Sequence, residues 1–107
     1  MTTAQLQAAL NLEPICQAGG EREITGWYAG DLLSWVMGRA ESGNVWVTIM
    51  TNLNVIAVAQ LTDVACVIFA EDVDVEPAVI AKAEAQGINL YRSSLSTYDL
   101  CHAQLLL

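Results

Sequence analysis

Residues able to do chemistry are sparse in this chain, and one run of them follows a strand-like stretch. Thr51, Asn52 and Asn54 lie in "TNLN", after the β-rich "VWVTIM" and before the apolar "VIAVAQL". In a parallel sheet this places them at the carboxyl end of a strand, where ligands commonly bind. Free backbone N–H groups at the start of a helix can hold an anion there. The same residues could instead simply cap the helix, so ligand binding and capping by Thr51 or Asn52 stay open as alternatives.

The glycine-rich stretch "GGEREITGWYAGDLLSWVMG", residues 19–38, raises the question of a phosphate-binding loop. Such a loop needs a lysine directly after its last glycine. The single lysine, Lys82, lies inside a predicted helix far downstream, and the glycine spacing also differs from the dinucleotide-binding pattern. We therefore assign these glycines to turns and helix ends, where positive φ favours glycine.

Nucleophiles, bases and metal ligands do not fall together in the sequence. His102, the only histidine, adjoins Cys101 on a predicted helix, and adjacent helical residues point in different directions. Cys16, Cys66 and Cys101 are widely spaced, which supports neither a disulfide framework nor a zinc or iron–sulfur site. The acidic residues within 71–76 match no calcium loop and favour a solvated segment before a helix. We expect no catalytic residue, no metal and no cofactor, and therefore a protein that is not an enzyme.

The charge of the chain excludes two classes of partner. Twelve acidic residues face four basic ones, which gives a net charge of −8, and the basic residues are scattered. Nucleic acids and anionic membranes need clustered Lys and Arg, so we expect neither as a partner. Residues 42–62 carry no charge, but their polar side chains favour a strand and a helix over a membrane span. The start resembles no secretory signal and the cysteine count is odd, which together indicate the cytoplasm.

Apolar and aromatic residues are abundant for so small a chain. The hydrophobic fraction is 54% and only 15% of residues are charged, which predicts an apolar face left exposed on the monomer. Trp27, Tyr28, Trp35 and Trp46 carry much of the aromatic area, and all four would be crowded in one small core. Because Trp and Tyr are enriched at interfaces, we predict a homodimer whose surface includes some of these residues.

The elements that must position these residues alternate along the chain. Helices are predicted at 2–11, 30–40, 51–61, 77–87 and 94–107, and extended or strand segments at 12–16, 22–28, 45–50, 64–70 and 88–92. The run at 64–70 is apolar throughout, which is typical of a central strand covered on both faces. From Arg22 onward strands and helices alternate. We therefore predict one α/β domain over residues 1–107, with a mostly parallel sheet flanked by helices and right-handed crossovers.

Capping residues mark the predicted helix ends. Thr3 and Asp31 are candidate N-caps of the first two helices, and Ser96 opens a Ser-x-x-Asp capping box for the last one. Pro77 fits the first position of the fourth helix, and Gly87 fits its C-terminal cap.

Three long stretches, residues 10–37, 45–70 and 83–100, resemble the DRTGG domain family, in particular its small stand-alone members that accompany iron-only hydrogenase subunits. The resemblance is strongest in "REITGWYAGD" and "GINLYRSSLSTYDL". This chain has Thr51-Asn52-Leu53-Asn54 where many relatives have Gly-Asp-Arg, and Ala70-Glu71-Asp72 where many have Thr-Gly-Gly.

The resemblance implies an α/β fold similar to the amino-terminal domains of HPr kinase and of a cell-wall (Mur) ligase. It implies a regulatory or assembly role rather than kinase activity, because the kinase domain proper carries its own phosphate loop. We therefore expect a non-catalytic module that forms a homodimer and docks on a hydrogenase-type redox enzyme of anaerobic metabolism. The alternative is a sensor of a nucleotide or another small anion that binds around Thr51, Asn52 and Asn54.

Overall fold

One five-stranded sheet organises residues 1–107, all of which the computed structural model describes. In chain order the elements are α1 (Thr3–Leu10), β1 (Glu13–Gln17), β2 (Gly26–Ala29), α2 (Leu33–Arg39), β3 (Asn44–Thr48), α3 (Leu53–Thr62), β4 (Cys66–Phe69), α4 (Pro77–Gln86), β5 (Asn89–Arg92) and α5 (Thr97–Gln104). The strand order is β1-β5-β4-β3-β2. Strands β2 to β5 are parallel and β1 is antiparallel to β5, which confirms the predicted α/β class with a mostly parallel sheet.

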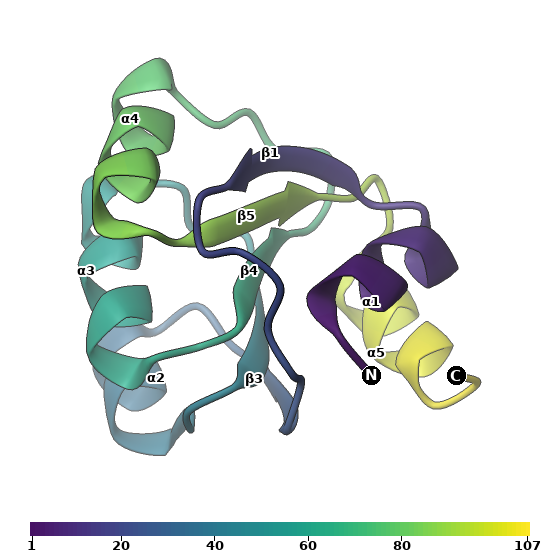
Figure 1. Ribbon diagram of the computed structural model, residues 1–107. Coiled ribbons are helices and arrows are strands. Elements are labelled where there is room, and N and C mark those ends of the chain that lie inside the picture. Colours follow the sequence, from purple (N-terminus) through teal and green to yellow (C-terminus); the bar gives the residue numbers. More distant parts are fainter.

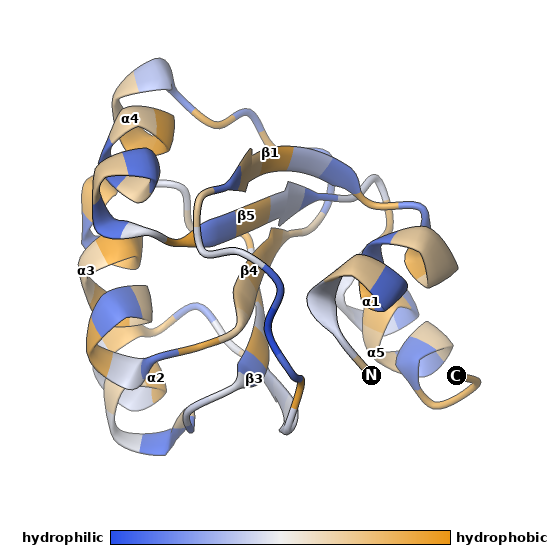
Figure 2. Cartoon of the chain, viewed as in Figure 1, coloured by the Kyte–Doolittle hydropathy of each residue, from blue (hydrophilic) through white to orange (hydrophobic).

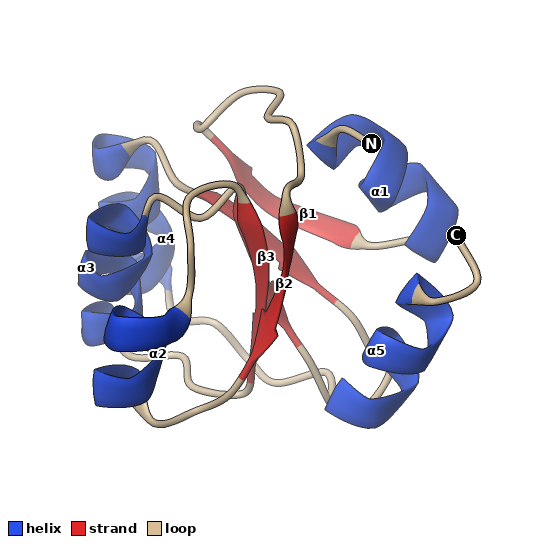
Figure 3. Ribbon diagram, turned by 90° about the horizontal axis from the view of Figure 1, so that it is seen from below, coloured by secondary structure: helices blue, strands red, loops and turns tan.

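Helices cover both faces of the sheet. Figures 1 and 3 show α2, α3 and α4 on one face and α1 and α5 on the other. Alternate residues of β4 point to opposite faces of the sheet. Phe69 packs with α3 and α4, whereas Ile68 packs with residues of α1 and α5. Both faces of the strand are therefore apolar, which explains its continuous hydrophobic sequence and its orange colour in Figure 2.

Most helices begin or end at the residues that the predicted capping signals indicated. Asn52 caps α3 by accepting a hydrogen bond from the N–H of Asn54, and Ser96 caps α5 by accepting one from the N–H of Asp99. Pro77 begins α4 and Gly87 ends it with φ of +71°. The N-cap of α1 is Thr2 rather than the expected Thr3, because Thr2 forms a capping box with Gln5 and Thr3 is buried.

The expected N-cap at Asp31 is wrong. The N-cap of α2 is Leu32, which makes no side-chain capping bond. The Asp31 carboxylate instead accepts hydrogen bonds from the hydroxyl of Thr48 and from the N–H of Ile49. Asp31 thus joins the loop after β2 to the loop after β3, because the end of β3 offers it two donors at once.

The buried side-chain amide of Asn89, at the start of β5, links the turn at Gly19 and Gly20 to Ala65, which precedes β4. Asn89 accepts a hydrogen bond from the N–H of Gly19 and donates to the carbonyls of Gly20 and Ala65. Strand β2 begins only at Gly26, and the residues before it pair with the start of the chain at Thr2. No helix has the length and apolar character that a bilayer span requires.

Candidate functional site

The loops that carry polar and ionisable residues follow the carboxyl ends of the parallel strands and therefore lie at the same end of the sheet. The loops after β2, β3, β4 and β5 all leave this end, since the four strands run in the same direction. Ligands bind at this end in open α/β sheets. The predicted Thr51, Asn52 and Asn54 lie in the loop after β3 and the first turn of α3, at this end as the sequence analysis expected.

A hollow of about 350 Å³ brings two of the predicted ligand residues together with the start of α4. Its lining consists of Asn52, Leu53, Asn54, Glu76, Ala78 and Val79, and Thr51 is not part of it. The amino-terminal ends of α3 and α4 both border this hollow, which suits an acceptor group on a ligand. Two features oppose a highly charged anion: the carboxylate of Glu76, and the capping bond that engages the oxygen of Asn52.

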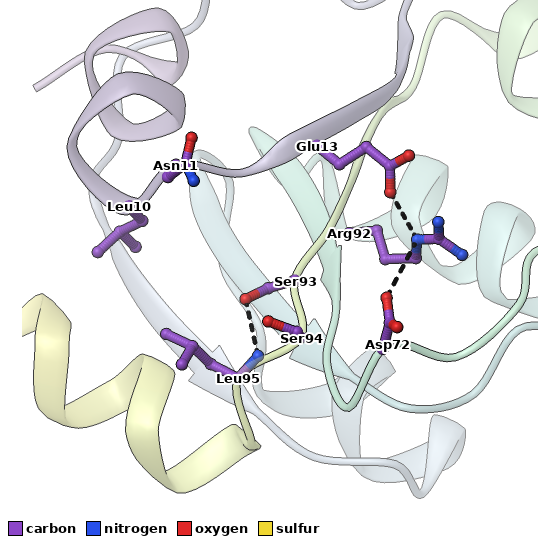
Figure 4. Close-up of a pocket in the computed structure, with 8 residues that line it drawn as sticks. All are labelled: Leu10, Asn11, Glu13, Asp72, Arg92, Ser93, Ser94 and Leu95. Atoms are coloured by element: carbon purple, nitrogen blue, oxygen red, sulfur yellow. Dashed lines mark hydrogen bonds and ion pairs between the residues drawn. The ribbon is translucent and has the colours of Figure 1, made fainter.

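A second hollow, of about 380 Å³, lies at the point where the chain changes faces (Figure 4). Neighbouring strands β4 and β5 lead to α4 on one face and α5 on the other (Figure 3). Such a switch point opens a crevice between the diverging loops. The lining residues are Leu10, Asn11, Glu13, Asp72, Arg92, Ser93, Ser94 and Leu95. Sequence reasoning missed this hollow, because the alternation of strands and helices does not tell which face α5 covers.

Arg92, the last residue of β5, is held by carboxylates from two other segments. Its Nε lies 2.6 Å from a carboxylate oxygen of Glu13 and 3.7 Å from one of Asp72, and its Nη1 lies 3.5 Å from one of Asp74. The hydrogen bond that Arg92 donates to the Glu13 carboxylate, more than the surrounding charges, raises the pKa of Arg92 above its usual value. Three carboxylates around one guanidinium leave this region with an excess of negative charge. The acidic loop is exposed as expected, but two of its carboxylates take part in this cluster.

The loop after β4 adopts a backbone conformation that favours glycine. Glu71 and Asp72 have φ of +63° and +55°, in the left-handed region. Their N–H groups donate to the carbonyls of Leu95 and Ser93, each at 2.9 Å, which ties this loop to the loop after β5. The sequence resemblance to the DRTGG family aligns these two positions with the Gly-Gly of that family's motif. The glycines of that motif therefore fit the backbone geometry seen here.

The four aromatic residues predicted at the interface differ in how far they are buried. Trp46 is fully buried, and its indole N–H donates to the carbonyl of Gly30 at 2.9 Å. The prediction that Trp46 is an interface residue is therefore wrong, because this side chain fills the core between the sheet and its helices. Trp27 and Tyr28 are half-buried on β2, whereas Trp35 is 52% exposed, with the Arg39 guanidinium 3.7 Å from its ring centre.

Several exposed apolar residues lie on α2 and its N-cap, in the loop after β3 and in the first turn of α3. We call this set the α2 patch: Leu32, Trp35, Met37, Ile49 and Leu53. Helices α2 and α3 pack against each other, and the Asp31 bond to Ile49 holds the two loops together. Beside them β2 is the last strand of the sheet, so its outer edge pairs with no other strand. This end of the molecule thus combines an apolar surface with an open strand edge.

The cysteines and the histidine are placed for packing. Cys66 is fully buried, and burial raises its thiol pKa to about 12. Cys16 is also buried, on the opposite face of the sheet from Cys66, and burial raises the pKa of Cys101 on α5. His102 stacks on Tyr98 with ring centres 6.3 Å apart. No three His, Cys, Asp or Glu side chains come together as ligands of one metal ion.

Comparison with known proteins supports the fold. No family model matches the sequence, and no curated protein matches it. Among solved structures, the chain is similar to the CBS and DRTGG domains of the regulatory region of Clostridium perfringens pyrophosphatase, crystallised with the activator diadenosine tetraphosphate. The TM-score is 0.74 at 9% identity, over 94% of this chain and 44% of that chain. The likeness shows a DRTGG-like fold, and that neighbour is a regulatory region rather than a catalytic one.

Proposed function

We propose that this chain is a non-catalytic regulatory or assembly module that self-associates through the α2 patch. The observation that carries the proposal is the distribution of charge. Of the 12 acidic and 4 basic residues, only Asp31, Arg39 and Glu41 fall between residues 24 and 62. This part of the chain, residues 24–62 with β2, α2, β3 and α3, has a net charge of −1, and the rest of the chain has −7. Two strongly acidic copies repel each other least when these nearly neutral parts meet.

The same part of the chain supplies what an interface needs. Leu32 and Trp35 are 58% and 52% exposed, and large apolar side chains of this kind gain most when they are removed from water. Trp is also the residue type most enriched among interface residues that dominate binding energy. The open edge of β2 offers backbone groups that a second copy could pair. The regulatory character of the structural neighbour supports the same role.

The oligomeric state of matched charge variants tests self-association. Trp35→Glu puts a carboxylate into the α2 patch, and Tyr98→Glu puts one on α5, where Tyr98 is 77% exposed and outside the patch. Light scattering coupled to gel filtration should give a dimer for the wild-type chain and for Tyr98→Glu, and a monomer for Trp35→Glu with an unchanged circular dichroism spectrum. A wild-type monomer at high concentration, or equal behaviour of both variants, would refute the proposal.

The resemblance of the sequence to hydrogenase-associated DRTGG proteins points to a redox enzyme as the docking partner, in the cytoplasm of an anaerobic cell. The acidic part of the module stays free in a dimer built on the α2 patch, and it would meet a basic surface of that partner. Binding of the purified module to a hydrogenase subunit should therefore weaken strongly as salt is raised. Salt-independent binding, or none, would argue against this docking.

A small-ligand sensor is the second candidate, and the hollow between the starts of α3 and α4 favours it. The nucleotide activator of the structural neighbour makes nucleotides the first probes. Calorimetry against a nucleotide panel that includes diadenosine tetraphosphate should show binding that Asn52→Ala removes. Asn52→Ser is the matched control for folding, since Ser also caps a helix but has no amide. The absence of binding to every nucleotide would exclude this function.

A further inference from the structure

We infer that the switch-point hollow beside Arg92 is a binding site for a small organic cation that carries a primary ammonium group. The hollow belongs neither to the α2 patch nor to the site at Asn52. It lies at the β1–β5 end of the sheet, and the α2 patch lies at the β2 end. The inference therefore stands or falls separately from self-association.

The first support is the position of the hollow in the topology. Three segments that are distant in sequence border it: the connection from α1 into β1, the loop that follows β4, and the end of β5 with the loop that follows it (Figure 4). Diverging connections of neighbouring parallel strands create a crevice of this kind in open α/β sheets, and ligands bind there by preference. The volume of about 380 Å³ lies within the range of small-molecule sites.

The second support is the sign of the local charge. Glu13 and Asp72 each direct one carboxylate oxygen toward Arg92, which leaves the second oxygen of each free to accept a donor from a ligand. Asp74, whose carboxylate lies 3.5 Å from Nη1 of Arg92, adds a further negative charge. An anion entering the hollow would meet two carboxylates and an Arg92 whose Nε and Nη1 are already engaged. An ammonium group would meet an excess of negative charge.

The remaining lining groups suit an ammonium donor as well. The carboxyl-terminal end of α1 reaches the hollow at Leu10 and Asn11, and helix carbonyl ends favour cations. The hydroxyl of Ser94 and the side-chain oxygen of Asn11 are additional acceptors. The three N–H donors of a primary ammonium can thus find partners on different sides of the site.

The third support is that the walls are fixed before any ligand arrives. The N–H of Glu71 donates to Leu95 and that of Asp72 to Ser93, so the two loops that form one wall move together. The N–H of Leu95 in turn donates to the hydroxyl oxygen of Ser93, at 3.1 Å. A site whose loops are already ordered loses little conformational freedom on binding.

Titration with 1,4-diaminobutane, followed by amide chemical shifts, tests the inference. We expect saturable shifts centred on Asn11, Ser93, Ser94 and Leu95. Asp72→Asn should weaken binding about threefold, the size of one exposed charge pair. Asparagine tolerates the positive φ of position 72, so this variant should fold. Glu84→Gln removes the same charge from the exposed side of α4 and should leave the affinity unchanged.

Two further probes fix the chemistry of the ligand. The uncharged analogue 1,4-butanediol should cause no saturable shift, and neither should ADP at these residues. The inference is overturned if the diamine shifts spread over all acidic segments without saturation. It is also overturned if Glu84→Gln weakens binding as much as Asp72→Asn, or if the diol or ADP occupies the hollow in place of the diamine.

Discussion

Replacing Glu71 with glycine should stabilise the fold. A residue with a side chain pays about 1–2 kcal/mol to stay in the left-handed region, and glycine pays nothing there. Glycine also gains about 0.4–1 kcal/mol of freedom in the unfolded chain, which opposes the relief of strain. With φ of +63° and an exposed side chain at Glu71, Glu71→Gly should raise the free energy of unfolding by about 0.7 kcal/mol. Its N–H bond to Leu95 is a backbone bond and survives the change.

The matched control makes the same chemical change where the backbone is helical. Glu84 is an exposed residue inside α4, and Glu84→Gly should lower the free energy of unfolding by about 0.7 kcal/mol. Both variants lose one negative charge, so the net charge of the chain is the same in the two measurements. Urea unfolding followed by the fluorescence of buried Trp46 gives both values, and Tm should rise by about 3–5 °C for Glu71→Gly. If both variants are destabilised alike, the loop is not strained and the explanation of the Gly-Gly motif fails.

Three further outcomes follow from named contacts. Asn89→Ala should destabilise the fold by about 2–3 kcal/mol in urea unfolding, because three backbone groups lose their partner at a side chain that is 2% exposed. The hydrogen bond from Ser42, followed in effect by the charge of Arg22, lowers the pKa of Asp63 below 3.8, so its contribution is present above that pH and is lost as pH falls through the lowered value. Asp63→Asn should therefore lower stability at pH 7 and flatten the decline of stability as the pH falls below 3.8. In thiol labelling of the native protein at pH 8, Cys101 should react first and Cys66, with its pKa of about 12, only as fast as the chain unfolds.

The fold was predictable because its signals are local. The run at 64–70 is typical of a strand covered on both faces, and Pro77 and Gly87 bracket α4 because their backbone preferences act within one turn. The same locality explains the error at Asp31. A helix-capping residue is recognised from the residues that follow it, but Asp31 is engaged by donors of β3, 17 and 18 positions away. The sequence shows that Asp31 can accept hydrogen bonds, but its donors, Thr48 and Ile49, are known only from the three-dimensional structure.

The candidate sites were predictable in part for a related reason. The strand-to-helix placement of Asn52 and Asn54 follows from local patterning, and the structure adds that the start of α4 shares their hollow. The switch-point hollow depends on α5 packing opposite α4, which no local pattern specifies. Trp46 lies in β3, whose side chains alternate between the two faces of the sheet. Both faces are covered, so every residue of β3 is buried. Composition therefore could not separate Trp46, which fills the core, from Trp35, which is exposed.

The positions that give the DRTGG family its name have a structural meaning in this chain. Placing Gly-Asp-Arg on Thr51, Asn52 and Leu53 puts the relatives' aspartate at the N-cap of α3, where asparagine serves equally well. Thr-Gly-Gly likewise falls on a turn whose left-handed geometry this chain retains without glycine. In this chain both stretches therefore adopt a backbone that would suit those motifs, with side chains of different chemistry. Where the motif of the DRTGG family has an arginine, this chain has Leu53, an apolar side chain that is 48% exposed and belongs to the α2 patch. Leu53 therefore offers no positive charge to an anion beside Asn52 and adds apolar area to the proposed contact, which is why we rank self-association above nucleotide binding.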